Sequence, residues 1–461
     1  MTRFNPHIFR AYDIRGVAAR DLTDAVVFAL GQALGTFFSR GEGDKVVFVG
    51  RDNRLSSPRL RDALVKGLVA SGCDVCDIGE VVTPVLYFAC ASQGGGNGVM
   101  ITASHNPPEE NGFKIVAGGA AIHGETIQQL RKTVESGLFA SGKGSVRQED
   151  VVSAYLTMLR EKISLGPRRL KVAVDCGNGA ASLFAAEVLR RWGCEVVPLF
   201  CEPDGTFPHH QPDPVKTANL RELQRAVIEE GCDLGVGYDG DADRLGVVDE
   251  KGGIIWGDKL MILFWREILP RYPDKPCIVE VKCSQALVDE ILRLGGRPFF
   301  WKTGHSLVKA KMREVGAVFT GEMSGHLFFA DEYYGFDDAF YATGRLLRIL
   351  SHTDQPLSAL LADVPHYYAT AETRIPCPDE RKFAVVAGLA AHFRKTNEVI
   401  TVDGARVLFV DGWGLVRASN TQPVLVARCE AKTPEGLAQI CNVMHSAITA
   451  AVGIPGFAWE F

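Results

Sequence analysis

Ser104 is a lone hydroxyl in an unusual setting. In the stretch "MITASHNPPEENGFKI" (residues 100–115) it stands beside His105 and ahead of two prolines. A serine placed in this way can cap a turn, act as a hydrolase nucleophile or carry a transferable group. The nucleophilic serine of an α/β-hydrolase lies in a G-x-S-x-G motif, whereas this sequence reads T-A-S-H-N. A histidine adjacent in sequence also has poor geometry to act as a base on Ser104, so the hydrolase alternative is disfavoured.

Three carboxylates, Asp239, Asp241 and Asp243, occupy every second position of "GYDGDADRLG". The flanking segments are apolar and β-like, so the carboxylates repel one another in a short loop unless a cation lies among them. Mg²⁺ prefers oxygen ligands of this kind. A solvated acidic turn is the plain alternative, but the spacing favours a metal site. The adjacent Arg244 suits a phosphate or a sugar oxygen.

Two familiar motifs are only partly met by the same loop. The glycines of "GVGYDG" spell G-x-G-x-x-G, but carboxylates follow where a pyrophosphate would bind. An EF-hand loop needs glycine where Arg244 stands. A phosphoserine at Ser104 facing Mg²⁺ explains both clusters, because phosphoryl transfer needs positioning and charge neutralisation. An aspartyl-phosphate enzyme, with Asp239 as the nucleophile, remains open at this point.

Three further loops have side chains suited to binding anions and sugar hydroxyls. They read "KTGHSLVK", "GEMSGHLFF" and "RASNTQP". The last combines a guanidinium fork, two hydroxyls and an amide, which suits a phosphate. Each loop also reads as a polar turn or a capped helix start. Their candidate residues are Lys302, His305 and Lys309; Glu322, Ser324 and His326; and Arg417, Ser419, Asn420 and Thr421.

A repeated unit of strand, polar turn, helix, glycine and strand must position these loops. In the first unit, leucines recur every fourth residue between a Ser57-Pro58 start and a stop at Gly72. Ligand chemistry gathers at the carboxyl ends of the strands of such sheets. The expected strands are in 45–54, 171–174 and 278–281, and the expected second and third helices are 180–191 and the segment capped by Ser284.

The three units predict three related α/β domains with mixed sheets. The segment "YYATAETRIPCPDERKF" breaks the repeat, so the tail is predicted to be an α+β domain. The predicted domains are 1–149 with the Ser104 loop, 150–253 with the aspartate loop, 254–365 with "GEMSGH" and 366–461 with "RASNTQP".

Composition narrows the class of partner. The 461 residues carry a net charge of -5 and no lysine or arginine run, so nucleic acid is not expected. No stretch of about 18 uninterrupted apolar residues predicts a membrane helix, and no signal peptide is expected. The 12 cysteines are scattered, and the Cys73–Cys76 pair alone makes a poor zinc site. Reduced thiols in a cytoplasmic protein are the expectation.

Motifs along the whole chain resemble the α-D-phosphohexomutase superfamily, most closely its bacterial phosphomannomutase/phosphoglucomutase branch. They are "FRAYDIRG", "TASHNP", "NGFKI", "DGDADR", "KTGHS", "GEMSGH" and "RASNTQPVLVARCEA", in this order. The resemblance implies four domains around a central cleft and a phosphoserine at Ser104. Mg²⁺ would be held by the phosphorylated Ser104 and the three aspartates. The enzyme would interconvert mannose and glucose 1- and 6-phosphates through a 1,6-bisphosphate that turns end for end.

The resemblance also implies roles for individual residues. Glu322 and Ser324 would hold sugar hydroxyls, and Lys114 or His326 would act as general acid or base. The residues expected to be catalytic are Ser104, Lys114, His326 and Arg15. Those expected to bind substrate are Tyr12, His105, Arg244, Lys282, His305, Glu322, Ser324, Arg417, Ser419, Asn420 and Thr421. Glucose or mannose 1,6-bisphosphate is the expected activator, sugar phosphates are the only expected partners, and a monomer is expected.

One position departs from the family pattern. Ala242 stands where the metal loop commonly has a second glycine. Metal binding is expected to survive if this alanine has a negative φ. The loop "HHQPDP" (residues 209–214) is expected to be structural rather than metal-binding. The rival functions are a phosphoglucosamine mutase, a catalytically silent sugar-phosphate sensor and a metal-dependent phosphatase. The methionine of "GEMSGH" and the "SNT" of the phosphate loop favour mannose and glucose over glucosamine.

Overall fold

A computed structural model describes residues 4–39, 46–92, 94–420 and 422–461. The chain forms two compact units, which consist of residues 1–268 with 305–362, and of residues 269–304 with 363–461. Within the described ranges, none of the helices has the length and apolar character needed to cross a membrane.

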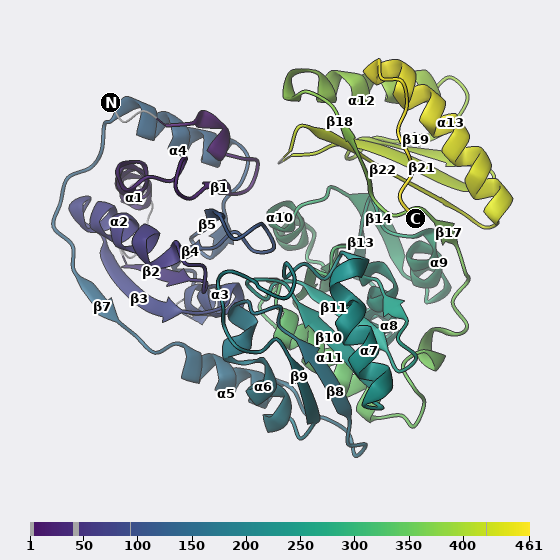
Figure 1. Cartoon of the computed structure of the whole chain (residues 1–461), viewed down its shortest axis with the longest axis horizontal. Coiled ribbons are helices and arrows are strands. Elements are labelled where there is room, and N and C mark those ends of the chain that lie inside the picture. Colours follow the sequence, from purple (N-terminus) through teal and green to yellow (C-terminus); the bar gives the residue numbers. More distant parts are fainter. Residues whose placement is uncertain (1–3, 40–45, 93, 421) are drawn as a thin grey trace. The chain divides into compact units, whose positions relative to one another are not determined.

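The N-terminal part of the first unit is built on a mixed sheet with strand order β1-β5-β4-β2-β3-β7 (Figure 1). Strand β2 runs parallel to β3 and β4, and β5 is antiparallel to β4 and β1. Helices α1, α2 and α4 share one apolar core with β2, β4 and β5. The elements are η1 (Pro6–Ile8), β1 (Ile14–Val17), α1 (Asp24–Phe38), β2 (Val46–Arg51), α2 (Ser57–Ala70), β3 (Asp74–Glu80), α3 (Thr83–Ser92), β4 (Asn97–Ile101), β5 (Glu110–Ala117), β6 (Ala120–Ala121), α4 (Glu125–Ser136), β7 (Val146–Gln148) and α5 (Val152–Lys162).

The rest of the first unit contains a second mixed sheet, with strand order β12-β11-β10-β8-β9. Strands β8, β9 and β10 are parallel, and the hairpin β10–β11 is antiparallel. Its elements are β8 (Lys171–Asp175), η2 (Ala180–Leu183), α6 (Ala185–Arg191), β9 (Glu195–Leu199), η3 (Thr217–Leu220), α7 (Arg221–Glu229), β10 (Leu234–Tyr238), β11 (Leu245–Asp249), β12 (Ile254–Ile255), α8 (Gly257–Ile268), α10 (His305–Val315), β15 (Phe319–Gly321), β16 (Leu327–Phe329), α11 (Ala339–Ser351) and η5 (Ala359–Leu361).

The three predicted strand–helix–strand units are present, with two local differences. Ser57 is the first residue of α2 rather than its cap, because its hydroxyl donates to Asp52 Oδ1 at 2.5 Å instead of accepting from the helix. The expected single helix at 180–191 is a 3₁₀ turn followed by α6, with Phe184 between them. Ser284 caps α9 as expected, accepting from Ala286 N at 3.2 Å.

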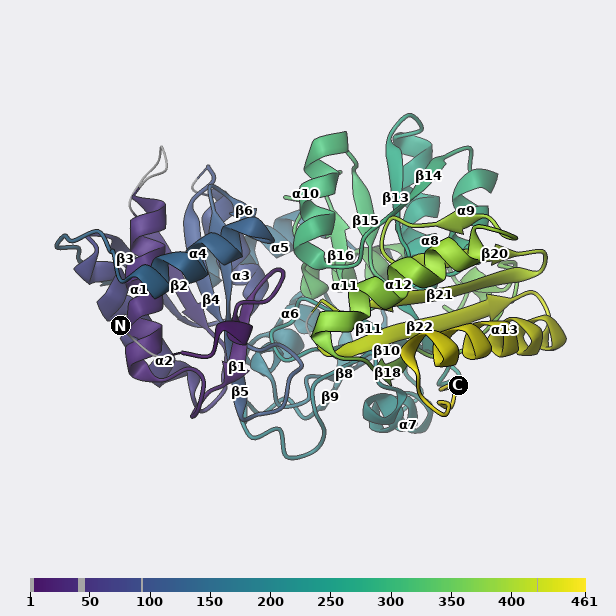
Figure 2. The same ribbon diagram turned by 90° about the horizontal axis from the view of Figure 1, so that it is seen from above.

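The second unit combines the third repeat with the C-terminal residues. Strands β13 and β14 are parallel, and the sheet β17-β22-β21-β20-β19 is antiparallel, with β18 also on β22. Figure 2 shows α12 and α13 lying along this sheet, and both share its core. Strand β21 alternates, so Trp413 and Leu415 pack with Val281 on the other face. The elements are η4 (Leu269–Arg271), β13 (Pro276–Glu280), α9 (Gln285–Arg293), β14 (Arg297–Trp301), β17 (Tyr368–Ala369), β18 (Thr373–Pro376), α12 (Asp379–Phe393), β19 (Val399–Ile400), β20 (Ala405–Phe409), β21 (Gly412–Ala418), β22 (Val424–Ala431) and α13 (Pro434–Val452).

Candidate functional site

Ser104 lies in the turn between β4 and β5, buried and with a left-handed backbone (φ 53°). Its N–H donates to Thr102 Oγ1 at 2.9 Å, and its Oγ donates to Asp239 Oδ2. His105 Nδ1 lies 3.1 Å from the same Oγ. This sequence neighbour is therefore within hydrogen-bond reach of the hydroxyl. Because the serine proton is directed to Asp239, the His105 ring is placed to donate to Oγ rather than to remove its proton.

The backbone of the Ser104 turn is held by one buried guanidinium. Arg54 is 1% exposed and is paired with Asp52 at 3.2 Å. Its Nη atoms donate to four carbonyl oxygens, which are those of Ser104 at 2.7 Å, Asn106 at 2.5 Å, Pro107 at 2.5 Å and Glu110 at 3.0 Å. A planar guanidinium can satisfy several converging acceptors at once, whereas an ammonium cannot do so with the same geometry.

A loop after β9 supports the Ser104 turn from the second sheet. Phe207 lies under the Arg54 guanidinium, 5.0 Å from it, and Gln211 donates to the His105 carbonyl. A Cβ on Gly205 would lie 2.4 Å from the Asn53 carbonyl oxygen, so only glycine fits. The "HHQPDP" segment belongs to this loop, and His210 Nε2 lies 3.0 Å from Asp175 Oδ2. Its contacts are those of a packed loop.

The three aspartates follow β10, and all three have no exposed surface. Asp239 Oδ1 accepts from the N–H groups of Asp243 and Arg244, both at 3.0 Å, which closes the loop. Lys114, from β5, donates to Asp241 Oδ2 at 2.6 Å and to Asp243 Oδ2 at 2.5 Å. A Cβ on Gly240 would lie 2.3 Å from the Ser104 carbonyl oxygen. The glycine therefore allows the aspartate loop to lie directly on the Ser104 turn.

The cluster fits a hard divalent cation. Asp241 Oδ1 and Asp243 Oδ1 are buried without a hydrogen-bond partner, and ligand atoms of all three aspartates lie within 4.8 Å of one another. Burial, together with the charges of Asp243 and Asp241, raises the pKa of Asp239 well above its ordinary value. Burial lowers the pKa of Lys114, but the aspartates outweigh it and the net pKa is raised. One ammonium shared among three carboxylates leaves negative charge that a cation would neutralise.

Ala242 contradicts one expectation. Its φ is 58°, in the left-handed region that costs a residue with a Cβ roughly 1–2 kcal/mol, so the expected negative φ is wrong. The loop enforces this conformation, because Ala242 N donates to the Asp239 carbonyl at 3.1 Å while the next N–H turns back to the Asp239 carboxylate. The alanine therefore adopts the conformation that a glycine would adopt without strain.

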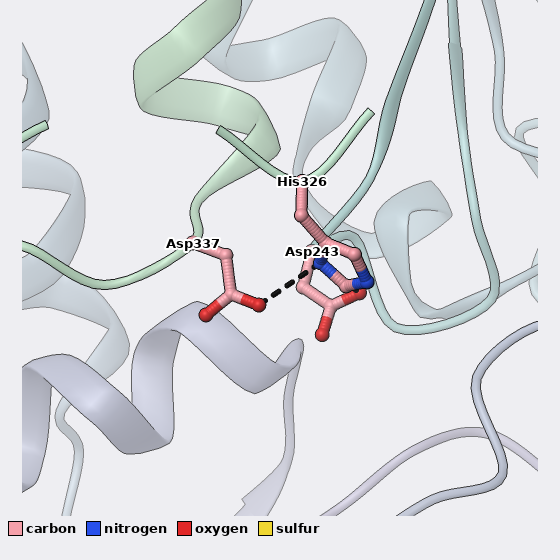
Figure 3. A group of neighbouring side chains, drawn as sticks. All are labelled: Asp243, His326 and Asp337. Carbon is pink, nitrogen blue, oxygen red and sulfur yellow. Dashed lines mark ion pairs between the residues drawn. The ribbon is translucent and has the colours of Figure 1, made fainter. Parts of the chain in front are cut away.

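His326 bridges the aspartate loop and Asp337. Arg244 Nε donates to His326 Nε2 at 2.9 Å, so that nitrogen is unprotonated and Nδ1 carries the hydrogen. Nδ1 lies 2.9 Å from Asp337 Oδ2 and 3.5 Å from Asp243 Oδ1. Figure 3 marks the pair with Asp337. The three residues could also hold a metal ion by proximity. Asp337 is already paired with His326, and Lys309 donates to its Oδ1 at 2.6 Å. This carboxylate therefore has partners without a metal ion.

Other predicted residues of the first unit join the same region. Arg15 Nη1 donates to the Ala103 carbonyl at 3.2 Å and to Asn106 Oδ1 at 3.0 Å. His305 is stacked on His326, with ring centroids 5.4 Å apart, and Tyr12 meets His305 edge-on at 5.5 Å. Burial, followed by the charge of Lys309, lowers the pKa of His305 well below its ordinary value, so the ring is neutral.

The "GEMSGH" turn is fixed to the strand that follows Arg244. Glu322 is buried, and its N–H donates to the His326 carbonyl at 2.8 Å. Gly325 has φ 90°, and a Cβ there would lie 2.4 Å from the Leu245 carbonyl oxygen. Leu245 N in turn donates to the Gly325 carbonyl at 3.0 Å. Ser324 lies half-buried in the same turn.

The remaining predicted residues belong to the second unit. Lys282 Nζ donates to Glu372, and Arg417 Nε donates to Asp403 Oδ2 at 2.9 Å. Burial lowers the pKa of Lys282, but Glu280 and Glu372 outweigh it and the net pKa is raised. Ser419 Oγ accepts from Gln422 N at 3.1 Å, and Asn420 is half-buried beside it. Thr421 lies outside the described residues.

Sequence reasoning missed Arg54 and Asp337. Arg54 stands among ordinary turn formers in "RDNRLSS", and no local signal marks it. Asp337 could have been predicted from the sequence, since "GFDDAF" places two adjacent carboxylates between apolar residues. Lys309, taken as a possible anion grip, is instead paired with Asp337.

Comparisons with known proteins agree over nearly the whole chain. Family models described as phosphoglucomutase/phosphomannomutase match four segments: alpha/beta/alpha domain I at 6–141, domain II at 153–253, domain III at 256–368 and the C-terminal domain at 372–446. A phosphomannomutase/phosphoglucomutase of Pseudomonas aeruginosa is 47% identical over 96% of each chain. A phosphoglucomutase of Neisseria gonorrhoeae is 43% identical over 97% of this chain and 98% of its own. A crystal structure of a phosphoglucomutase/phosphomannomutase family protein from Burkholderia thailandensis superposes with a TM-score of 0.92, at 42% identity over all of both chains.

Strain at Ala242 predicts an unusual response to glycine. An ordinary buried alanine such as Ala173 in β8 should lose about 1–2 kcal/mol of stability as glycine, through the lost methyl and the greater chain entropy. Ala242→Gly should lose at least about 1 kcal/mol less, or gain, because the left-handed strain is relieved. Thermal melting of both variants checks this. An equal loss in both would contradict the strain.

The role of Arg54 predicts a defect that lysine cannot repair. Arg54→Lys keeps the charge but leaves several buried carbonyls without a donor, which should cost on the order of 3 kcal/mol. The melting temperature should fall, and limited proteolysis should cut within residues 104–110. The exposed Arg225 in α7 gives a matched control as Arg225→Lys. Wild-type protease resistance in Arg54→Lys would show that the turn does not depend on this guanidinium.

Proposed function

Because this chain belongs to the phosphoglucomutase/phosphomannomutase family and is a phosphohexomutase, an intramolecular phosphotransferase, we propose that it interconverts the 1- and 6-phosphates of mannose and glucose. The observation that carries the proposal is the contact of the Ser104 hydroxyl with Asp239 in the buried carboxylate cluster. A transferable phosphoryl group on Ser104 would lie beside the cation that these carboxylates fit.

The proposed metal ligands are Asp239, Asp241, Asp243 and an oxygen of the phosphoryl group on Ser104. The unpartnered buried oxygens of Asp241 and Asp243 support this assignment. Bound Mg²⁺ would supply charge neutralisation for the phosphoryl group. Ala242 keeps the conformation of the loop despite its Cβ, so its substitution for glycine does not argue against the site.

The proposed reaction moves one phosphoryl group twice. A hydroxyl of the bound sugar monophosphate attacks phosphorus, the bond to Ser104 Oγ breaks, and a 1,6-bisphosphate forms. After the bisphosphate turns end for end, the phosphoryl group at its other end returns to Ser104. Each transfer takes a proton from the attacking hydroxyl and delivers one to the departing oxygen.

The proposed catalytic residues are Ser104, Lys114, His326 and Arg15. Lys114 has a raised pKa and stays protonated, so its ammonium can stabilise the departing oxygen through its charge and a hydrogen bond. His326 Nδ1 lies 2.9 Å from Asp337 Oδ2, which leaves Nε2 as the nitrogen able to accept a proton when Arg244 turns to substrate. Arg15 holds the Ser104 turn and adds positive charge beside it.

Binding of either end of the sugar is assigned to the loops that carry the predicted residues. The proposed substrate-binding residues are Tyr12, His105, Arg244, Lys282, His305, Glu322, Ser324, Arg417, Ser419, Asn420 and Thr421. We propose that the segments 1–149, 150–253, 254–365 and 366–461 each contribute one loop. Glucose or mannose 1,6-bisphosphate would prime the enzyme by phosphorylating Ser104.

We further propose that the enzyme acts as a cytoplasmic monomer. No disulfide joins any of the twelve cysteines, all of which lie in described ranges, and this supports a reducing compartment.

Phosphorylation should be confined to one hydroxyl. After incubation with glucose 1,6-bisphosphate and Mg²⁺, intact mass should show one added phosphoryl group, absent in Ser104→Ala and retained in Ser446→Ala, an exposed serine of α13. Mutase activity should fall below detection in Ser104→Ala only. Phosphate on another residue, or an active Ser104→Ala, would overturn the phosphoserine mechanism.

The substrate range is tested by a coupled assay. Glucose 1-phosphate and mannose 1-phosphate should be isomerised with similar kcat in Mg²⁺, and chelation with EDTA should abolish both reactions. Isomerisation of glucosamine 1-phosphate alone would assign the enzyme to the rival mutase. Net release of inorganic phosphate at the rate of turnover would instead indicate a phosphatase.

A further inference from the structure

Two thiols outside the proposed site lie close enough to react with each other. Cys176 follows β8 and Cys201 follows the parallel neighbour β9, and their Sγ atoms are 3.2 Å apart. Cys176 is fully buried, whereas Cys201 is half-buried and reaches solvent. A disulfide needs an S–S distance of about 2.05 Å, so the two sulfurs must approach by about 1 Å.

Both thiols start segments that position the reacting groups. From Cys176 the chain continues to Gly179, whose missing Cβ leaves room for Gly240 in the aspartate loop, and Ala180 N donates to the Gly240 carbonyl at 2.9 Å. From Cys201 it continues to the loop whose Gln211 donates to the His105 carbonyl.

The backbone around the pair has little freedom to absorb a shift. Asn178 and Phe200 both have left-handed backbones, with φ of 58° and 50°. Asn178 N donates to the Phe200 carbonyl at 2.9 Å, so the two strained residues are joined. Such residues persist only where surrounding contacts determine them, and a movement of the sulfurs is therefore passed on to both loops.

We propose that Cys176 and Cys201 form a reversible regulatory disulfide when the enzyme meets a peroxide, and that this disulfide lowers mutase activity by displacing the Ser104 and aspartate loops. Cys201 is the attacking thiol because it reaches solvent. Burial and the adjacent Cys201 raise the pKa of Cys176 well above its ordinary value, so Cys176 is the less reactive of the two thiols toward peroxide. Its attack on the oxidised Cys201 relies on the short distance of 3.2 Å between the two sulfurs.

The chemistry takes two steps and balances with hydrogen peroxide as the oxidant. The Cys201 sulfur attacks one oxygen of the peroxide, the O–O bond breaks, and a sulfenic acid and one water result. The Cys176 sulfur then attacks the Cys201 sulfur, the S–O bond breaks, and a second water leaves. The two thiols lose two electrons and two hydrogens, and the peroxide is reduced to two waters. A dithiol reductant reverses the disulfide.

The experiment treats the full-length enzyme with hydrogen peroxide, alkylates the remaining thiols and maps the peptides by mass spectrometry without reduction. A peptide pair joined through Cys176 and Cys201 is expected, with kcat lowered about tenfold to a hundredfold, since a misplacement of about 1 Å can cost this much. Dithiothreitol should restore kcat. The peptide map is independent of catalysis, so a failure of this proposal is distinguishable from a failure of the proposed function.

Variants distinguish inactivation by the Cys176–Cys201 disulfide from inactivation by oxidation of other residues. Cys201→Ser should keep its activity in peroxide, and Cys176→Ser should stop at a sulfenic acid trapped by dimedone on Cys201. Cys441→Ala, in a second pair of neighbouring thiols that is buried in the C-terminal sheet core, should respond like wild type. The proposal is overturned if no peptide pair joined through Cys176 and Cys201 is found, or if the joined pair forms and kcat is unchanged. It is also overturned if peroxide inactivates Cys201→Ser as strongly as the wild-type enzyme.

Discussion

Three carboxylates without exposed surface in one short loop are the constraint that organises the first unit. An uncompensated buried charge costs several kcal/mol, so positive groups must come to the loop from elsewhere in the chain. Lys114 arrives from the first sheet and bonds two of the aspartates. Because one ammonium cannot balance three carboxylates, the cluster keeps negative charge that a cation could neutralise. The charge balance thus ties the two sheets of this unit together.

The Ser104 turn and the aspartate loop meet backbone to backbone at Gly240, and each contains a left-handed residue. Ser104 and Ala242 each sit at a positive φ that costs about 1–2 kcal/mol. Such conformations persist where other contacts outweigh them. Here the compensation comes from the hydrogen bonds that Asp239 accepts and from the carbonyls that Arg54 holds.

Buried arginines hold the turns of proposed site residues in both units. Arg54 binds four carbonyls of the Ser104 turn, while Arg406 donates to the Val281 and Cys283 carbonyls at 2.7 and 2.9 Å, and Arg428 donates to that of Lys282. In each unit the arginine holds the turn through backbone carbonyls, so the side chain of Ser104 or Lys282 is not needed to fix the turn. Turns held in this way have a defined position before substrate arrives, which reduces the cost of ordering them.

The sequence by itself determined the parts of this protein that depend on short spacings. These are the serine turn, the aspartate loop and the repeated strand–helix–strand units, with the motifs that carry the family resemblance. Only the tertiary structure decided which partners complete them. Arg54 contacts the Ser104 carbonyl 50 residues away, and Asp239 contacts the hydroxyl 135 residues away. The backbone of Ala242 was misjudged for the same reason, because its φ is set by how the loop closes on Asp239 and packs on the Ser104 turn, and no local pattern records those contacts.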